Sequence, residues 1–401
     1  MKRLAVVLSA LAIVALFCGV VAARPHRPAH KARHTAGAKP VTASGPAVNC
    51  TARDPHVPVP DAPHGMYVWN PYKVQSGKFE KQLEASVIGK DPTLCGVSLV
   101  VGWSTVEPSK GSFDWSSIKT QAAPYLRAHL RVNLLFADAS EVGKSDTTTP
   151  SWVFTQDRVA KVQCPKQVDY PNFMDPKFES DWQSFIAAAV QKFGNDSSIG
   201  YMRFGIGAGV EAYPGHMENP SAKSRPCYNA WVKATGWTYR KWLKHSLNVV
   251  GMLARQGSQK QLMIALNYIV NSPSVYAYAN SVTAAAAPRG IAFGTENLGI
   301  GHVADPGTTP GPCNPQAKSE NLYWCQATKR HAGKVPIEFQ PIVATTPGYE
   351  YGYKLDISNL LPYAIANKAQ ILELYPQEWL ASDAKHKTAL RAAAQVLGVA
   401  H

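Results

Sequence analysis

Short apolar runs alternate along the chain with longer segments of mixed apolar and polar residues. The segments between the runs include stretches with helical spacing at 116–126, 178–193 and 228–253. Apolar runs of this length are typical of buried strands, and their alternation with helices favours a parallel sheet. Eight units of this kind predict an α/β fold, a closed (β/α)8 TIM barrel. The eight predicted strands are 65–69, 97–101, 131–136, 201–206, 262–266, 290–294, 336–339 and 369–374.

Three connections that follow predicted strands are long and contain Pro, Gly and Cys. They span 138–176, 212–226 and 297–335. In a barrel such connections lie at the carboxyl ends of the strands, where active sites of this architecture are found. No internal repeat and no second-domain linker follows residue 50. We therefore expect residues 49–401 to form a single domain with long active-face loops.

The first 48 residues differ from the rest in composition. Lys2 and Arg3 precede a run of apolar or small residues, 4–23, which predicts a secretory signal peptide cut after Ala23. The alternative is an uncleaved membrane anchor, because about twenty residues can span a bilayer. Residues 24–48 contain no acid and no large apolar cluster, so they predict a disordered basic tether. A secreted, extracellular protein without a membrane span after cleavage is expected.

The formal net charge is +14, but part of it lies outside the predicted domain. The signal segment carries two basic residues and the tether five, which leaves +7 on the remainder. This excess favours contact with anionic cell surfaces, mainly through residues 24–48. No stripe of Lys and Arg with interleaved aromatic residues occurs, so a nucleic-acid partner is not expected.

Six cysteines remain once Cys18 leaves with the signal segment. An even number in a secreted chain predicts three disulfides, and six cysteines allow fifteen pairings. Cys313 and Cys325 share one predicted loop, and Cys164 and Cys227 lie in neighbouring loops of a barrel, so we expect these two pairings, which leaves Cys50–Cys95. No C-x-x-C or Cys/His spacing occurs, so no metal site is expected.

The most specific motif follows the second predicted strand. It runs from Trp103 to Trp115 and reads WSTVEPSKGSFDW. It resembles the W-x-x-x-E-P-x-x-G-x-[FY]-D-W signature of TIM-barrel glycoside hydrolases, particularly the β-galactosidase-like families of the retaining clan. In those families the catalytic carboxylates end the fourth and seventh strands. The resemblance implies a barrel that hydrolyses an oligo- or polysaccharide without a cofactor.

The fourth predicted strand leads into the run GIGAGVEAYPG, which contains Glu211. Its glycines let backbone and substrate approach closely. In the retaining clan this position holds the general acid/base, usually after an Asn, whereas Val210 precedes it here. The run also resembles the G-x-G-x-x-G-E-x-x-Y-P segment of β-amylases, where the same glutamate is the general acid. The alternative is a rim glutamate bound to loop backbone.

The seventh predicted strand holds Glu338 among apolar residues, where a carboxylate is costly to bury unless it is paired or functional. The resemblance implies that Glu338 is the nucleophile, since glycoside hydrolysis needs two carboxyl groups beside the scissile bond. One alternative pairs Glu338 with an arginine such as Arg203. Glu296 and Glu373 compete for the role of second carboxylate or bind sugar hydroxyls, while Glu107 is better suited to organising its loop.

Aromatic residues at predicted strand ends are candidate substrate contacts, because sugars stack their apolar faces on aromatic rings. These residues are Trp69, Trp103, Trp152, Tyr375 and Trp379. For each of them the alternative is packing in the core. Asn70, Asn267 and Gln340 are candidate hydroxyl binders by position alone.

Together these features predict a secreted glycoside hydrolase with Glu211 as acid/base and Glu338 as nucleophile. Two other classes stay open. A catalytically silent barrel that binds glycans is suggested by Val210, and a cell-surface structural protein is suggested by the basic tether. No G-x-S-x-G elbow, P-loop or H-E-x-x-H motif supports an esterase, nucleotide-binding or zinc-protease function.

Overall fold

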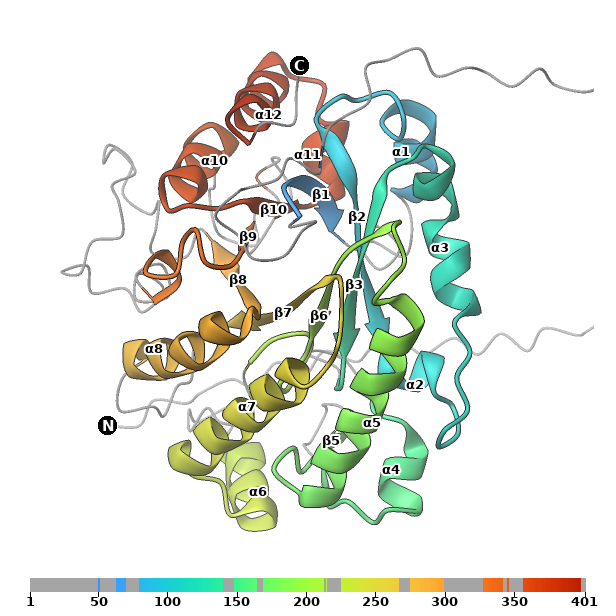
Figure 1. Cartoon of the computed structure of the whole chain (residues 1–401), viewed down its shortest axis with the longest axis vertical. Helices are drawn as coiled ribbons and strands as arrows, with labels where there is room; N and C mark the ends of the chain where they lie inside the picture. Colours follow the sequence, from blue (N-terminus) through green and yellow to red (C-terminus); the bar gives the residue numbers. More distant parts are fainter. Residues whose placement is uncertain are drawn as a thin grey trace, which may run out of the picture. The chain divides into compact units, whose positions relative to one another are not determined.

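A closed barrel of eight parallel strands forms the centre of the fold, with helices around it (Figure 1). This computed structural model describes residues 50, 63–69, 79–139, 148–163, 169–212, 214, 225–266, 275–298, 327–341, 345 and 356–397. The predicted (β/α)8 architecture is confirmed. By backbone contacts the chain divides into residues 1–43 and 44–401, and all described residues belong to the second unit. The predicted signal peptide and tether lie outside the described residues.

The barrel strands follow the chain order, and the last closes onto the first through pairing of β10 with β1. Each overlaps one of the eight predicted runs. A short antiparallel pair, β4 (Lys161–Gln163) and β5 (Asp169–Pro171), lies in the connection between β3 and β6. The barrel strands are β1 Gly65–Trp69, β2 Leu94–Gly102, β3 Arg131–Ala137, β6 Ile199–Phe204, β7 Gln261–Leu266, β8 Ala292–Leu298, β9 Ile337–Pro341 and β10 Ile371–Leu374.

Helices cover the outside of the barrel. The single helix predicted over 228–253 is instead two, α6 and α7. Gly236 between them has a φ of 59°, a conformation that glycine adopts without steric cost, and the Thr238 side chain caps α7 by accepting from the Lys241 amide. The described helices are α1 Glu80–Ser86, α2 Trp103–Val106, α3 Ser116–Arg127, α4 Ser151–Thr155, α5 Pro176–Phe193, α6 Arg225–Thr235, α7 Tyr239–Ala254, α8 Val275–Ala286, the 3-10 turn η3 Ala287–Arg289, α10 Ile357–Ala366, α11 Pro376–Leu380 and α12 Ala384–Val396.

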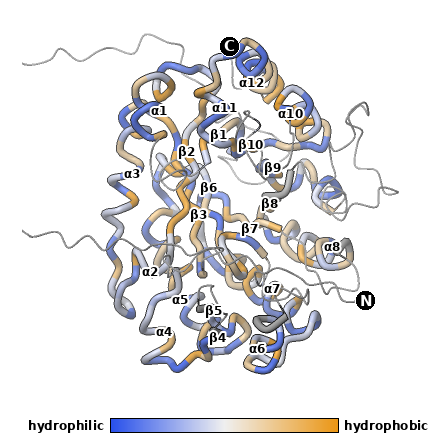
Figure 2. The backbone as a smooth tube through the Cα atoms, turned by 180° about the vertical axis from the view of Figure 1, so that it is seen from behind, coloured by the Kyte–Doolittle hydropathy of each residue, from blue (hydrophilic) through white to orange (hydrophobic). Residues whose placement is uncertain are grey.

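Apolar packing between strands and helices makes up most of the core. Figure 2 shows hydrophobic stretches along β2 and β3, with hydrophilic positions along outer helices such as α12. Among the described helices, none combines the length and apolar character that crossing a membrane requires.

The motif after β2 is a folding unit centred on Glu107. One carboxylate oxygen accepts from Trp103 Nε1 at 2.6 Å, and the other accepts from the Gly111 amide at 2.7 Å. Gly111 has a φ of 74°, which favours glycine. The Glu107 carbonyl also accepts from Trp152 Nε1 at 3.1 Å. These bonds explain the spacing of Trp, Glu and Gly in the motif and confirm that Glu107 organises its loop.

The predicted disulfide between Cys50 and Cys95 is present and ties the segment before β1 to β2. The side chains of Cys164, Cys227, Cys313 and Cys325 lie outside the described part of the chain. Their two pairings therefore stay predictions.

A buried histidine clamp holds Thr345, in the connection after β9, against the last two helices. The backbone amide and the hydroxyl of Thr345 both donate to Glu378 of α11. His386 of α12 lies 3.2 Å from Glu378 Oε2 through Nε2 and 2.7 Å from Asp383 Oδ2 through Nδ1. The hydrogen bond to Glu378 raises the pKa of His386 to about 9, against the opposing effect of burial. At neutral pH the His386 imidazole is therefore protonated, and it lies between the carboxylates of Glu378 and Asp383.

We expect replacement of His386 by Gln to destabilise the protein in a pH-dependent way. The folded pKa of about 9 exceeds the unfolded value of about 6.5, so the stabilisation is complete below about pH 6.5 and is lost as the pH rises through about 9. Urea unfolding should show a loss of about 1–3 kcal/mol at pH 6 that shrinks toward pH 10, since a tenfold change in proton affinity corresponds to about 1.4 kcal/mol. The exposed Lys387→Gln is the control, and a loss that is equal at both pH values would contradict the clamp.

Candidate active site

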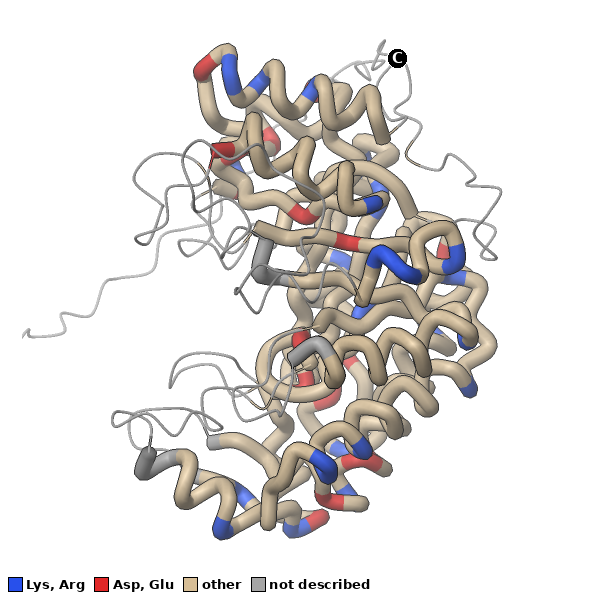
Figure 3. Tube along the Cα trace, turned by 90° about the vertical axis from the view of Figure 1, so that its left-hand side faces the viewer, with Lys and Arg blue, Asp and Glu red and all other residues tan. Residues whose placement is uncertain are grey.

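A buried cation occupies the interior of the barrel. Nη1 of Arg203, on β6, lies 3.3 Å from Glu338 Oε2 on β9 and 3.1 Å from Glu373 Oε2 on β10. All three side chains are fully buried. Figure 3 shows acidic positions (red) within the barrel, while most lysines and arginines (blue) lie on the surrounding helices. Arg203 therefore links strands on different sides of the barrel.

Hydrogen bonds extend this network toward β2 and β3. The Tyr201 hydroxyl donates to Glu373 Oε1 and lies 3.2 Å from Ser98 Oγ, which also accepts from Asn133 Nδ2 at 3.1 Å. Burial raises the pKa of Tyr201 well above its usual range, and the charge of Glu373 adds to this effect. Tyr201 is consequently a fixed donor to Glu373, and Arg203 compensates the buried carboxylates.

Glu338 is the second residue of β9, and its side chain lies over β8. A Cβ added at Gly294 of β8 would lie 1.7 Å from Glu338 Oε2, so only glycine leaves room for this carboxylate. Gln340, two residues further along β9, lies nearer the carboxyl end and is 3% exposed. The pairing of Glu338 with Arg203, one of the two interpretations of the sequence, is present in the structure.

Glu211 belongs to the segment 205–212, which folds back over the ends of the neighbouring strands. Its carbonyl accepts from the Ile206 amide at 3.1 Å, and its backbone pairs with Ala265 of β7. The Gly209 amide donates to Ala139 O at 2.8 Å, and Gly209 has a φ of 72°. Glu211 is 4% exposed. The segment is thus anchored to the strand ends on both sides.

The Glu211 backbone and the Glu338 carboxylate lie against neighbouring strands of the barrel. Ala265 of β7, beside Glu211, pairs with Gly294 of β8, over which the Glu338 carboxylate lies. Two strand spacings separate the Glu211 backbone from that point, a distance of about 10 Å.

Two predicted aromatic contacts lie together at the carboxyl ends of adjacent strands. Trp69 ends β1 and Tyr375 follows β10, and their ring centroids are 5.2 Å apart. Both rings are partly exposed. They remain candidates for stacking on a sugar.

The other three predicted aromatic contacts are wrong, because these rings pack in the core. Trp103 is fully buried, with its ring centroid 5.2 Å from that of Trp182 on α5 and 5.5 Å from that of Trp152, which is 3% exposed. Trp379 is 5% exposed and donates to Thr93 at the amino-terminal end of β2, away from the carboxyl ends. These tryptophans hold helices against the barrel instead of facing a ligand.

Three predicted site residues cannot be placed in this geometry. Asn70 and Asn267 lie outside the described residues, and Glu296 belongs to β8 with its side chain outside the described part. Glu373 is placed in the Arg203 network. Within the described ranges, no group of three His, Cys, Asp or Glu residues is arranged to hold a metal ion.

Asp138 was missed by sequence reasoning and lies directly under the segment that carries Glu211. It follows β3, is fully buried, and its Oδ1 lies 2.8 Å from the position of a Cβ on Gly205. Among the described residues no hydrogen bond in good geometry reaches its carboxyl oxygens. Burial raises the pKa of Asp138 well above its usual range, although the amides of Asp138 and Ala139 oppose this. The sequence feature that could have identified Asp138 is its position immediately after an apolar run.

Comparison with known proteins gives likeness in structure only. No family model matches the sequence, and no curated protein matches it. The catalytic domain of a β-amylase from Paenibacillus polymyxa is similar with a TM-score of 0.55 and 13% identity, over 82% of this chain and 97% of that domain. A β-galactosidase from the psychrophilic Marinomonas ef1 has a TM-score of 0.49 and 12% identity, and the match covers 84% of this chain and 60% of that one. The chain therefore shares the (β/α)8 barrel of the β-amylase domain.

Replacement of the buried Asp138 by Asn should stabilise the protein increasingly as the pH rises. A folded pKa above the unfolded value means that wild-type stability falls between about pH 3.9 and the folded pKa, with a slope of at most about 1.4 kcal/mol per pH unit. Asn keeps the shape without an ionising proton. Denaturant unfolding from pH 4 to 8 checks this, and a constant difference would contradict it. Asp114→Asn is a control with the opposite pH dependence. The hydrogen bond from the Ser116 amide lowers the pKa of Asp114, so this variant should lose stability relative to the wild type as the pH rises.

Proposed function

We propose that this protein is a secreted glycoside hydrolase that acts on an oligo- or polysaccharide, with Glu211 as general acid/base and Glu338 as the second carboxylate. The observation that carries the proposal is the placement of the two glutamates against neighbouring barrel strands. The Glu211 backbone pairs with Ala265 of β7, and the Glu338 carboxylate lies over Gly294 of β8. Cleavage of a glycosidic bond requires two carboxyl groups beside it.

The surroundings of each carboxyl group suit its proposed role. Arg203 beside Glu338 favours the ionised form, which a nucleophile or a general base needs. Glu211 is 4% exposed and follows the apolar Val210, and burial favours the neutral form of a carboxyl group, which can donate a proton. The partly exposed Trp69 and Tyr375 supply rings on which a sugar can stack.

A catalytically silent glycan-binding barrel is the second candidate. Its support is the complete burial of Glu338 in an ion pair, which gives this carboxylate a structural role, together with Val210 at the position where the retaining clan usually has Asn. The two candidates differ in turnover and share glycan binding. Release of reducing sugar from a panel of α- and β-linked polysaccharides distinguishes them.

Glu211→Gln should lower hydrolysis by a factor of about 10²–10⁴, because the variant keeps the shape of the side chain and loses the proton donor. Aryl glycosides with good leaving groups should be spared in the first step, since their departure needs little protonation. Glu338→Gln should abolish turnover with every leaving group. The exposed Glu84→Gln on α1 is the matched control, and thermal melting of each variant checks that it is folded.

Two outcomes would overturn parts of the proposal. If Glu338→Gln stays active while Glu296→Gln or Glu373→Gln is inactive, the assignment of Glu338 is wrong. The second carboxylate is then Glu296 or Glu373, whichever variant is inactive. If the wild-type protein hydrolyses nothing in the panel and binds glycans on an array, the silent barrel is correct.

A further inference from the structure

Side chains from the surrounding helices hold the main chain of the segment 205–212 from outside the barrel. Trp182 Nε1 of α5 donates to Gly205 O at 3.1 Å, and the Tyr278 hydroxyl of α8 donates to Ala212 O at 3.0 Å. His245 Nε2 of α7 lies 2.8 Å from Ile206 O. Two of these contacts are at the ends of the segment, and the His245 contact is at the residue that bonds to Glu211.

Ile206 connects His245 to Glu211 through one residue of main chain. Its carbonyl lies against His245 Nε2, while its amide donates to Glu211 O at 3.1 Å. A displacement of Ile206 therefore moves the backbone of Glu211. Contacts from three helices and the backbone hydrogen bond between Ile206 and Glu211 thus define the position of the proposed acid, Glu211.

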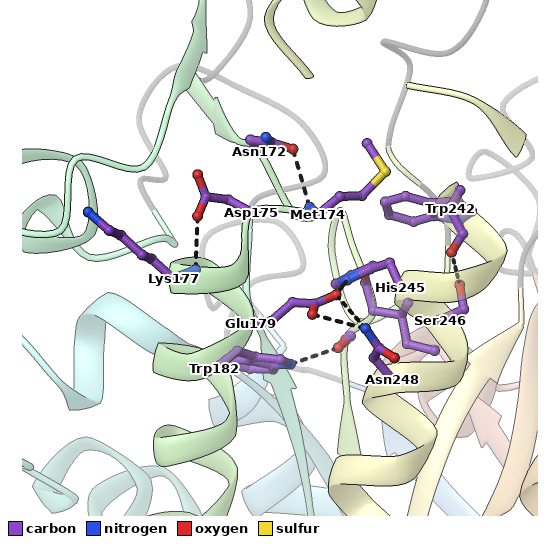
Figure 4. A network of polar contacts seen from close by, with 12 residues as sticks. Asn172, Met174, Asp175, Lys177, Glu179, Trp182, Trp242, His245, Ser246 and Asn248 are labelled. Carbon is purple, nitrogen blue, oxygen red and sulfur yellow. Dashed lines mark hydrogen bonds and ion pairs between the residues drawn. The ribbon is translucent and has the colours of Figure 1, made fainter. Parts of the chain in front are cut away.

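His245 is itself fixed by a pair of polar side chains (Figure 4). Its Nδ1 lies 2.8 Å from Glu179 Oε1, and Asn248 Nδ2 donates to both Glu179 oxygens at 3.1 and 3.0 Å. A backbone carbonyl only accepts, so Nε2 must carry a proton to bond Ile206. Nδ1 then faces a carboxylate oxygen of Glu179. The contacts form one chain from Asn248 through Glu179 and His245 to Ile206.

A structural role alone gives little reason for this series of contacts from Asn248 to Ile206. His245 is 2% exposed and lies on α7 beside fully buried apolar residues such as Trp242 and Val249. Burying the imidazole costs free energy that its contact with the partly exposed Glu179 offsets only in part, and an apolar side chain at this place would pack as well. What an apolar side chain cannot do is orient the Ile206 peptide.

We propose that His245, oriented by Glu179 and Asn248, is a positioning residue that sets the location of Glu211 through the main chain of Ile206. The inference rests on the proposed role of Glu211 as the acid. Since a misplacement of about 1 Å can cost about 100-fold in rate, loss of this contact should affect the step that needs the proton of Glu211.

The test uses His245→Met, His245→Gln and Glu179→Gln in the full chain, with Val249→Ala as the control for lost packing on the same helix. His245→Met should lower kcat by about 10- to 100-fold on substrates with poor leaving groups, with KM changed by less than about threefold. Activated aryl glycosides should be affected little. His245→Gln should recover much of the rate, because its amide can donate to Ile206, and Glu179→Gln should be intermediate.

Hydrogen exchange gives a readout that needs no activity. Peptides that cover 205–212 should exchange faster in His245→Met than in Val249→Ala, while strands β2 and β3 stay equally protected in both. An equal rate loss on both classes of substrate, or faster exchange that Val249→Ala reproduces, overturns the positioning role. If the wild-type protein has no activity, the proposed function fails and the exchange result alone decides whether His245 fixes the segment.

Discussion

The interior of this barrel is organised around one buried guanidinium. Arg203 reaches from β6 past β7 and β8 to carboxylates on β9 and β10. It supplies positive charge to two buried carboxylates, and breaking a buried ion pair typically costs about 3–5 kcal/mol. The space that Glu338 needs exists because β8 has Gly294 at that level. The glycine at position 294 therefore follows from the need to enclose the ion pair between Arg203 and Glu338.

In the outer layer, the motif after β2 is held by aromatic contacts and by local hydrogen bonds. Trp103 has rings from Trp182 and Phe185 around it, and its indole nitrogen is bonded by Glu107. Glu107 in turn holds the Gly111 amide. A motif that resembles a catalytic signature thus has a folding role in this chain. It fixes the loop after β2.

Sequence patterns predicted the features that depend on residues close together in the chain. They failed where the surroundings of a side chain depend on how deeply it lies in the barrel. The eight apolar runs located the strands, because a buried strand needs only a short continuous run. Trp103 and Trp379 were misassigned, since a position after a strand does not say whether a ring faces the mouth or a helix. The break at Gly236 was hidden by helical spacing on both sides. Glu338 was recognised as costly to bury and Arg203 was named as an alternative partner, but the choice between the two interpretations depends on strand order and register across the barrel.

The two candidate carboxylates are held by independent means. Glu338 is fixed through its side chain, by the charge of Arg203 inside the barrel. Glu211 is fixed through its main chain, by the Ile206 amide within the segment and by donors from α5, α7 and α8 outside it. The position of Glu338 therefore depends on the charges inside the barrel, whereas the position of Glu211 depends on the helices around it.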